Sequence, residues 1–334
     1  LQDFDLMTDL NVAYHKDGTV KTDIKTDTII LGDTHVDQTD PQAAQALAKS
    51  LVELNPKYIV LHDLFDGKSV NPHAKGNALE IIRMAEAGRL NIREEINRNR
   101  IFIESLARLL PNTTILIPDA NHNIWLQRYL QDAENVKLDR INGAYLSELL
   151  NAVNNMGRDA LEYAISTIKN DKDGFAEWEE PMRRRVVFMG MHTRMKMGPD
   201  SRMTEVGQHG HAGVNGMRGS ANSMALMSAQ IAAGHTHSPM YSKYYTNVGT
   251  NTLLNMGYNG AGASNWGVAF GRISEYGDMQ LVLFDKTSGR WYMPLGDDAA
   301  PASKAPFYPE NYPKLIPNSD KDPNVEAIPD QYST

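Results

Sequence analysis

The sequence predicts an α/β fold in which buried parallel strands alternate with helices. Short apolar runs at Ile29–Leu31 and Tyr58–Leu61 end in turn or polar residues, a pattern typical of buried strands. A segment with helical periodicity separates the two runs, so the strands should be parallel neighbours. Polar side chains follow the end of each run, and ligands bind at that edge of an α/β sheet. These three observations indicate a fold with a site at the carboxyl ends of its strands.

The composition of the 334-residue chain is that of a globular protein and excludes several functional classes. No apolar run is long enough to cross a bilayer, so we expect no membrane association. The absence of cysteine excludes disulfides, zinc–thiolate sites, iron–sulfur clusters and a thiol nucleophile in this chain. The formal net charge of -8 argues against binding nucleic acid by bulk charge. Action on DNA would need a local basic patch or bound metals.

The first third of the chain has clear start and stop signals. Asn11 to Asp23 predicts a hairpin that turns at an Asp-Gly pair. Asp40 is a plausible N-cap, with Pro41 at the first helical position and a helix running to about Leu54. This helix joins the first two strands.

Helices dominate the middle of the sequence. Asn77 to Leu110 predicts two helices that break near Gly88, with the arginines mainly on a solvated face. A third strand is expected at Thr113–Ile117, followed by a helix from Trp125 and a helical segment over 146–168.

Short strands and glycine turns return in the last third. Strands are expected at 186–189, 204–208 and 230–233, with several more between 244 and 284, and a Met/Ala-rich helix follows Ser220. Residues 295–334 are rich in Pro, Asp, Asn and Lys and predict an extended tail.

Five polar clusters each follow a short apolar run: Asp33/His35, Asp63/Asp66, Asn121/His122, His209/His211 and His235/His237. Parallel strands end at one edge of a sheet, so the clusters can converge in space. Two divalent cations roughly 3.5–4 Å apart, which share one carboxylate, need about this number of nitrogen and oxygen ligands. Manganese, magnesium, iron and zinc all suit such ligands.

The order of the motifs GDTH, HDLFDG, ANHN, QHGH and GHTH resembles the calcineurin-like metallophosphoesterases. The resemblance covers about residues 28 to 285. The run HNIWLQRYL after Asn121 and the later HGHAGVNGMRGS and GHTHSP segments are similar to a phage-encoded branch, in which nucleic-acid cleavage is a common role. The resemblance implies a four-layer αββα sandwich with a helical insertion.

The resemblance also implies roles for individual residues. It places Asp33, His35 and His237 on one metal, Asn121, His209 and His235 on the other, and Asp63 on both. His122 would donate to the phosphate or the leaving group, and Asp66 would orient His122. The nucleophile would be metal-bound water, since no side-chain nucleophile is expected.

Three positions depart from the family pattern. His62 and Ala120 replace glycines, and Asn123 stands where an acid is common. A neutral amide cannot support charge on His122 as a carboxylate would, so the rate or the metal preference could differ.

Several residues keep open alternatives. His192 competes with His209 as the fourth-motif ligand, although the glycine-rich sequence after His209 favours the latter. His211 is either a substrate contact or a hydrogen-bonded surface histidine. Arg218 either grips a phosphate or has a structural role, in which it caps a helix or pairs with an acid. Packing is favoured over base stacking for Trp266 and Tyr258, and a structural or solvent-exposed position is favoured for His15 and His73.

The expected function is two-metal hydrolysis of phosphoesters by a phage-type nuclease, with DNA as the favoured substrate and Mn²⁺ as the favoured ion. The alternatives are a phosphatase, a small-molecule phosphodiesterase, or a metal-stabilised scaffold without turnover. We expect an N-terminal hairpin segment at 1–27, compatible with the start of a fragment. A metallophosphoesterase domain at 28–294 with an insertion near 68–112, and a tail at 295–334, complete the expected organisation. The expected location is the cytoplasm, that of the host if the protein is phage-encoded, and a homo-oligomer is compatible with the sequence.

Overall fold

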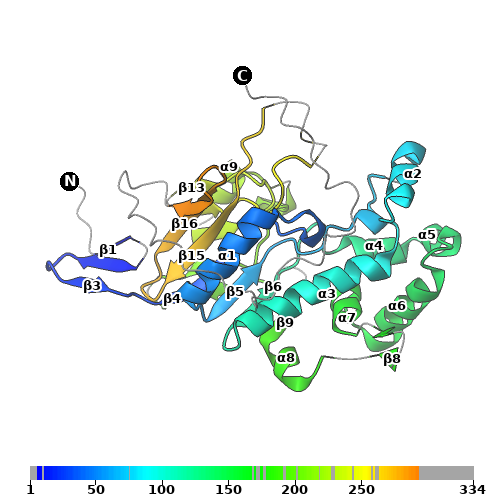
Figure 1. Ribbon diagram of the computed structural model, residues 1–334, viewed down its shortest axis with the longest axis horizontal. Helices are drawn as coiled ribbons and strands as arrows, with labels where there is room; N and C mark the ends of the chain where they lie inside the picture. The colour runs from blue at the N-terminus through cyan, green and yellow to red at the C-terminus, as the bar shows by residue number, and fades with distance from the viewer. Residues whose placement is uncertain are drawn as a thin grey trace.

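The structure is a computed structural model that describes residues 6–292, except 10, 75, 168, 171–173, 176–177, 191–192, 201, 218, 227–229, 243, 257–258 and 260–262. The predicted tail at 295–334 lies outside the described residues. Within them the chain is a mixed α/β protein with several sheets and nine α-helices, so the predicted α/β class is confirmed (Figure 1).

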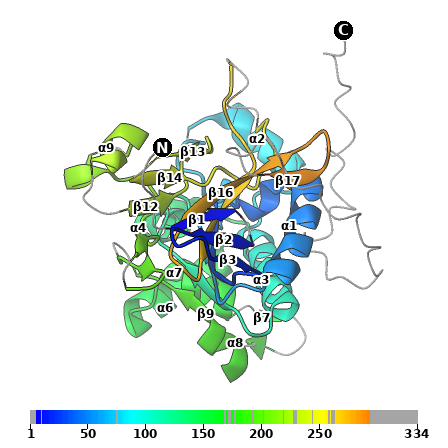
Figure 2. The same ribbon diagram turned by 90° about the vertical axis from the view of Figure 1, so that its left-hand side faces the viewer.

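The N-terminal hairpin is confirmed and is extended by one strand. β2 (Val12–His15) pairs antiparallel with β3 (Val20–Thr22), and β1 (Leu6–Asp9) pairs with the other edge of β2. This small sheet lies at one end of the molecule, toward the viewer in Figure 2.

A seven-stranded mixed sheet forms the centre, in the order β17-β16-β15-β4-β5-β6-β9. Its parallel part confirms the predicted strands and consists of β4 (Thr26–Leu31), β5 (Tyr58–Leu61), β6 (Thr114–Ile117) and β9 (Val186–Phe188). Its antiparallel part consists of β15 (Ala269–Ser274), β16 (Met279–Asp285) and β17 (Arg290–Tyr292).

A second, five-stranded sheet has the order β10-β11-β12-β14-β13. Its strands are short: β10 (Lys196–Met197), β11 (Thr204–Glu205), β12 (Gln230–Ala233), β13 (Met240–Tyr241) and β14 (Tyr245–Asn247). The middle strands β11, β12 and β14 are parallel, so their carboxyl ends share an edge. A separate pair joins β7 (Lys169–Asn170) and β8 (Gly174–Phe175).

Helix α1 (Pro41–Leu54) begins and ends where the sequence predicts. One carboxylate oxygen of Asp40 accepts the backbone N–H groups of Gln42 and Ala43, at 2.9 and 3.1 Å, and so caps the helix. The predicted break near Gly88 separates α2 (Ala78–Glu86) from α3 (Ile92–Leu109).

The segment predicted to be helical over 146–168 contains two helices within the described residues. Gly157 adopts φ 62° and ends α6 (Gly143–Met156), and Asp159 then caps α7 (Ala160–Ser166). The remaining helices are α4 (Trp125–Gln131), α5 (Ala133–Leu138), α8 (Glu180–Arg185) and α9 (Ala221–Ala225).

Alternation along the central strands divides the core into two parts. Ile29 and Leu31 point toward helices α1, α3, α4, α6 and α7, and form the larger cluster with them. Ile30, between them, points toward the second sheet and packs with Val206 and Ala232. Met224 of α9 packs with residues on β12 and β14 in a further cluster.

Candidate metal centre

Backbone pairing continues past the ends of β4 and β5 and brings the first two motifs together. The N–H of Thr34 donates to the carbonyl of His62 at 3.1 Å, and the N–H of His35 donates to the carbonyl of Asp63 at 2.9 Å. The carbonyl of Asp33 accepts the N–H of Asn251 and the hydroxyl of Thr250. The loop carrying Asp33 is therefore fixed on two sides.

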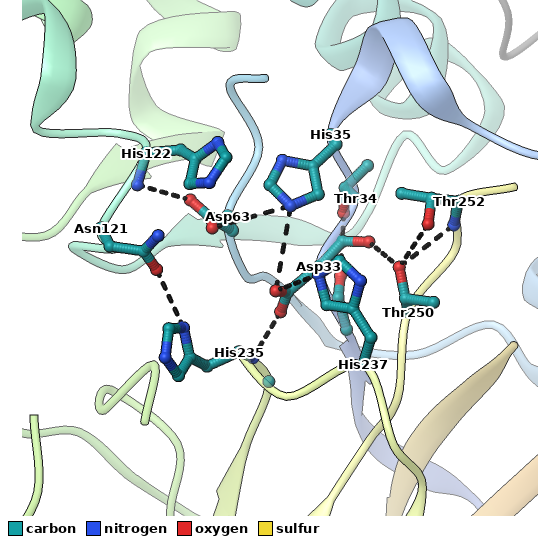
Figure 3. Close-up of polar contacts among 12 residues, drawn as sticks. Asp33, Thr34, His35, Asp63, Asn121, His122, His235, His237, Thr250 and Thr252 are labelled. Atoms are coloured by element: carbon teal, nitrogen blue, oxygen red, sulfur yellow. Dashed lines mark hydrogen bonds and ion pairs between the residues drawn. The ribbon is translucent and has the colours of Figure 1, made fainter. Parts of the chain in front are cut away.

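Asp33, His35 and His237 form one cluster of potential metal ligands, drawn in Figure 3. The Asp33 Oδ2 atom lies 2.8 Å from His237 Nε2 and 3.9 Å from His35 Nε2. All three side chains are buried. The structure thus brings together the three residues that the resemblance assigns to one metal.

A second cluster gathers around Asn121, whose Oδ1 atom lies 2.8 Å from His209 Nε2 and 3.1 Å from His235 Nδ1. Asp63 lies between the two clusters. Its Oδ2 atom is 3.4 Å from His209 Nε2 and 3.8 Å from His35 Nε2. All seven predicted ligands therefore meet in one place, and they come from the strand ends of both sheets.

His122 lies beside these clusters and is fixed by its backbone and its ring. Its N–H donates to Asp63 Oδ1 at 3.1 Å, and its Nδ1 lies 2.8 Å from the backbone carbonyl of Asp66. A carbonyl only accepts, so this contact places the proton on Nδ1 and leaves Nε2 for another partner.

Asp66 contacts His122 through its backbone rather than its side chain. The Asp66 carboxylate lies 3.9 Å from His35 Nδ1 and 3.5 Å from the ammonium of Lys68. Its Oδ2, the atom that faces Lys68, is buried and has no hydrogen-bond partner among the described residues. His35, Asp66 and His122 also offer ligand atoms close enough to hold a metal ion.

Burial and neighbouring charges set the protonation of the cluster. Burial alone would raise the pKa of Asp33, but the imidazoles of His209 and His237 hold it well below its ordinary value. Burial lowers the pKa of both His35 and His235 to about 4, helped by His122 and His209 respectively. Ionised carboxylates and neutral imidazoles are the forms that bind divalent metals.

His209 differs from these histidines. Burial opposes its charged form, but Asp33 and Asp63 raise the pKa of His209 above the ordinary value. Metal binding at His209 would therefore displace a proton that the two carboxylates favour.

The backbone at the site is strained in a way that is typical of functional sites. His35, Asp63, His235 and His237 have φ values of 34°, 42°, 73° and 58°, which non-glycine residues rarely adopt. The glycine before His235 is required by close approach, because a Cβ atom on Gly234 would overlap Asp33 Oδ1.

The residues present could hold a divalent cation. Two sets of three residues, Asp33/His35/His237 and Asp33/Asp63/His209, each have their ligand atoms within 4.8 Å of one another. The buried Nδ1 atoms of His35, His209 and His237 have no hydrogen-bond partner among the described residues. Buried polar atoms without partners are unfavourable, and a site that binds an ion tolerates them. Imidazole, carboxylate and amide donors suit manganese, iron or zinc.

A cavity of about 1060 Å³ opens over the clusters. His122, Trp125 and Trp266 line it, and the centroid of the Trp266 ring lies 4.2 Å from that of His237. The basic residues Lys68 and Arg83 also line it. Trp266 is half-buried at the site, so it is available to both packing and ligand contact.

Of the three positions that depart from the pattern of the family that the sequence resembles, Asn123 is explained by its hydrogen bonds. Asn123 accepts the N–H of Phe65 and donates its amide to the carbonyl of Pro118, each at 3.1 Å. A carboxylate could not make the second bond. His62 is buried behind the clusters, and burial lowers its pKa to about 3.

The structure describes some of the residues for which the sequence predicts alternative roles. His192, Arg218 and Tyr258 lie outside the described residues. His211 lies with its ring 5.6 Å from that of His209 and 6.2 Å from that of His235. His73 is exposed, and His15 packs edge-on against Tyr276 far from the cluster in sequence.

Two residues for which the sequence predicts no role support His122. Trp125 stacks on the His122 ring, with ring centroids 3.7 Å apart. Glu95 is buried on α3 and accepts hydrogen bonds from the backbone of Lys68 and Ser69, next to Asp66. His122 lies in the turn before α4, so helical spacing does not predict its contact with Trp125, and no local signal marks Glu95.

The chain is similar to one curated protein, "Protein A1" of Escherichia phage T5, with 29% identity over 275 residues. The match covers 78% of this chain and 46% of the phage protein, so the chain spans about half the length of that relative. No model of a known protein family matches the chain, and no solved structure matches it.

The helices are also informative about membranes. Among the residues that the structure describes, none forms a helix long and apolar enough to cross a bilayer.

Proposed function

We propose that this protein is a two-metal-dependent phosphoester hydrolase of the calcineurin-like type, acting as a phage-encoded nuclease on DNA. The observation that carries the proposal is the position of Asp63 between two ligand clusters, with Oδ2 3.4 Å from His209 Nε2 and 3.8 Å from His35 Nε2. A carboxylate shared by two cations is the feature that defines such centres. The packing of helices and a second sheet on opposite faces of the central sheet supports the four-layer αββα arrangement.

The side chains at the site have different roles in the proposed hydrolysis. Two bound cations supply charge to hold a phosphoryl oxygen and to activate a water molecule. His122 keeps its Nδ1 proton on the Asp66 carbonyl, so Nε2 remains for the substrate. When the ring carries a second proton, on Nε2, the imidazolium would donate that proton to the phosphate or the leaving oxygen and return to the neutral form. Lys68 and Arg83, at the cavity wall, add positive charge near the phosphate in a chain whose net charge is -8.

The similarity to a phage protein and the size of the cavity favour a nucleic-acid substrate. A cavity of about 1060 Å³ accommodates more than a phosphate monoester. The proposed location is the host cytoplasm, where DNA is accessible, and the favoured ion is Mn²⁺.

The experiment compares hydrolysis of DNA with hydrolysis of p-nitrophenyl phosphate monoesters and diesters, with Mn²⁺ and with EDTA. We expect Mn²⁺-dependent cleavage of DNA and of the diester. Turnover of the monoester without DNA cleavage would support a phosphatase instead. Absence of hydrolysis on every substrate, together with retained Mn²⁺ binding, would support a scaffold without turnover.

A further inference from the structure

A second cavity, of about 630 Å³, adjoins the metal-lined cavity. The two cavities share five lining residues, which form the wall between them: Lys68, Asn71, Ala74, Met84 and Trp125. The volume lies within the range of roughly 300–1,000 Å³ that small-molecule sites occupy. The metal centre does not account for this second cavity.

Trp125 contacts both the second cavity and the candidate catalytic residue His122. Its ring stacks on the ring of His122, with centroids 3.7 Å apart and planes inclined by 21°, and it also lines the second cavity. A substrate group that extends past His122 therefore reaches this space directly over Met84 and Trp125.

The walls of the second cavity combine apolar surface with an aromatic ring. Ile81 and Met84 of α2, Leu90, and Tyr129 of α4 line it, together with Ile141. Planar rings stack well on such walls, and stacking of a base on an aromatic side chain does not depend on the identity of the base.

Charged groups of both signs lie at the rim. Asp132 accepts the backbone N–H of Glu134 at 3.0 Å, and Glu134 pairs with Lys137 at 3.9 Å. The carboxylate of Asp139 accepts from the Tyr129 hydroxyl, the Asn142 amide and two backbone N–H groups, so its oxygens are already engaged. By contrast, Arg128 and Arg140 line the cavity, are exposed, and have no ion-pair partner among the residues that the structure describes. Guanidinium groups bind phosphate well.

We infer that the second cavity is a subsite for one further nucleotide of the substrate strand. Its base packs against Ile81, Met84 and Tyr129, and its phosphate lies near Arg128 and Arg140. This inference rests on the proposed phosphoester hydrolase, and it adds where the strand binds beyond the reacting phosphate.

The test pairs two substitutions on the same helix. Ile81 is 40% exposed and lines the second cavity, whereas Ile82 is 52% exposed and lines neither cavity. Ile81→Glu and Ile82→Glu add the same charge at neighbouring, partly exposed positions, so both variants should fold. Ile141→Glu, at a position that is 64% exposed, places a charge on the opposite wall.

The substrates are a short single-stranded oligonucleotide and versions with one abasic position on either side of the cleaved bond, with Mn²⁺ present. For the wild type, removal of the base that occupies the subsite should raise KM about tenfold. Ile81→Glu and Ile141→Glu should raise KM for the intact oligonucleotide by a similar factor and lose the discrimination against the abasic version. Ile82→Glu should behave as the wild type.

The outcomes separate the subsite from the hydrolase. Equal KM values for Ile81→Glu, Ile82→Glu and the wild type, or no effect of any abasic position, would overturn the subsite and leave the hydrolase intact. Turnover of bis(p-nitrophenyl) phosphate without oligonucleotide cleavage would also overturn it. No hydrolysis of either substrate would instead contradict the proposed function.

Discussion

At the scale of single residues, His122 is the side chain whose proposed role follows most directly from one contact. The carbonyl of Asp66 fixes the proton on Nδ1, and the stacked Trp125 ring limits rotation of the imidazole. Among the described residues, the His122 ring hydrogen-bonds the Asp66 carbonyl and stacks on Trp125, and its side chain makes no hydrogen bond to the seven predicted metal ligands. Replacement of His122 should therefore lower the rate of hydrolysis without weakening metal binding.

The first prediction is that His122→Ala lowers kcat by about 10²- to 10⁴-fold, the usual contribution of a general acid. The Mn²⁺ affinity should stay near that of the wild type, and calorimetric titration with Mn²⁺ beside DNA hydrolysis measures both. His15→Ala is the control, because His15 packs against Tyr276 and lines neither cavity. A wild-type rate in His122→Ala would exclude the role assigned to this histidine.

Gly234 shows how a residue without a side chain contributes to the site. A Cβ atom here would overlap Asp33 Oδ1, and the same oxygen accepts the N–H of His235 at 2.6 Å. Any larger residue at position 234 must move the Asp33 carboxylate from the place where it accepts the His235 N–H.

The second prediction is that Gly234→Ala weakens Mn²⁺ binding by about 10- to 100-fold, the range seen when groups that orient metal ligands are changed. Gly143→Ala is the matched control, since a Cβ atom there meets nothing within 4 Å. Metal affinities from calorimetry compare the two variants. Equal affinities would mean that Asp33 is not held by this close approach.

At the scale of elements, the 3-10 helix η2 (Lys68–Val70) and α3 are joined by one buried carboxyl group. Glu95 on α3 accepts from the N–H groups of Lys68 and Ser69, and from the Ser69 hydroxyl at 2.5 Å. Burial, together with the charges of Asp37 and Asp66, raises the pKa of Glu95 to about 8 from an ordinary value of 4.5. This contact holds the segment that presents the Asp66 carbonyl to His122.

The raised pKa gives the third prediction, which concerns stability against pH. Between about pH 4.5 and 8 the folded protein keeps a proton on Glu95 that the unfolded chain releases. The free energy of unfolding therefore falls as pH rises, by up to about 1.4 kcal/mol per pH unit, and levels off above pH 8. Glu95→Gln removes this proton, so from pH 6.5 to 8 the variant should gain about 2 kcal/mol relative to the wild type.

Urea unfolding of both proteins across this pH range measures the difference. Glu86→Gln, at an exposed position on α2, should follow the wild-type profile. Parallel profiles for Glu95→Gln and the wild type would mean that Glu95 is ionised in the folded protein at pH 6.5.

The elements that sequence predicts well are those with local signals. Asp40, Pro41 and the Asn-Pro pair at 55–56 mark both ends of α1, so its bounds follow from the chain alone. The break between α6 and α7 was missed because Gly157 lies inside a run with continuous helical periodicity. The strands β10 and β13 have two residues each and are defined by pairing with distant segments, which periodicity cannot reveal.

At the scale of the whole molecule, the clusters of candidate metal ligands draw their residues from both sheets. Asp33 and Asp63 follow strands of the seven-stranded sheet, whereas His209, His235 and His237 follow strands of the five-stranded sheet. The order of motifs indicated which residues meet. Periodicity predicted neither that the ligands come from two sheets nor that a second cavity lies behind Trp125, because both depend on packing between distant segments.

This arrangement gives the last prediction, which concerns metal removal. Ions bound between the sheets stabilise the folded protein over the unfolded chain, by about 2.7 kcal/mol when the metal concentration is 100 times Kd. Thermal unfolding at pH 7.5 should therefore occur several degrees higher with Mn²⁺ than with EDTA. Asp63→Asn should lose most of this shift, because Asp63 lies within 3.4 Å of His209 and 3.8 Å of His35 and contributes to both clusters.

The shift, rather than the absolute Tm, is the relevant measurement, because replacing a buried carboxylate also changes the stability of the metal-free protein. Lys16→Ala, on the exposed turn of the N-terminal hairpin, is a control in which the shift should be preserved. If Mn²⁺ and EDTA gave the same Tm for the wild type, the clusters would not bind metal between the sheets. An unchanged shift in Asp63→Asn would instead remove Asp63 from the ligand set and leave the two clusters as separate sites.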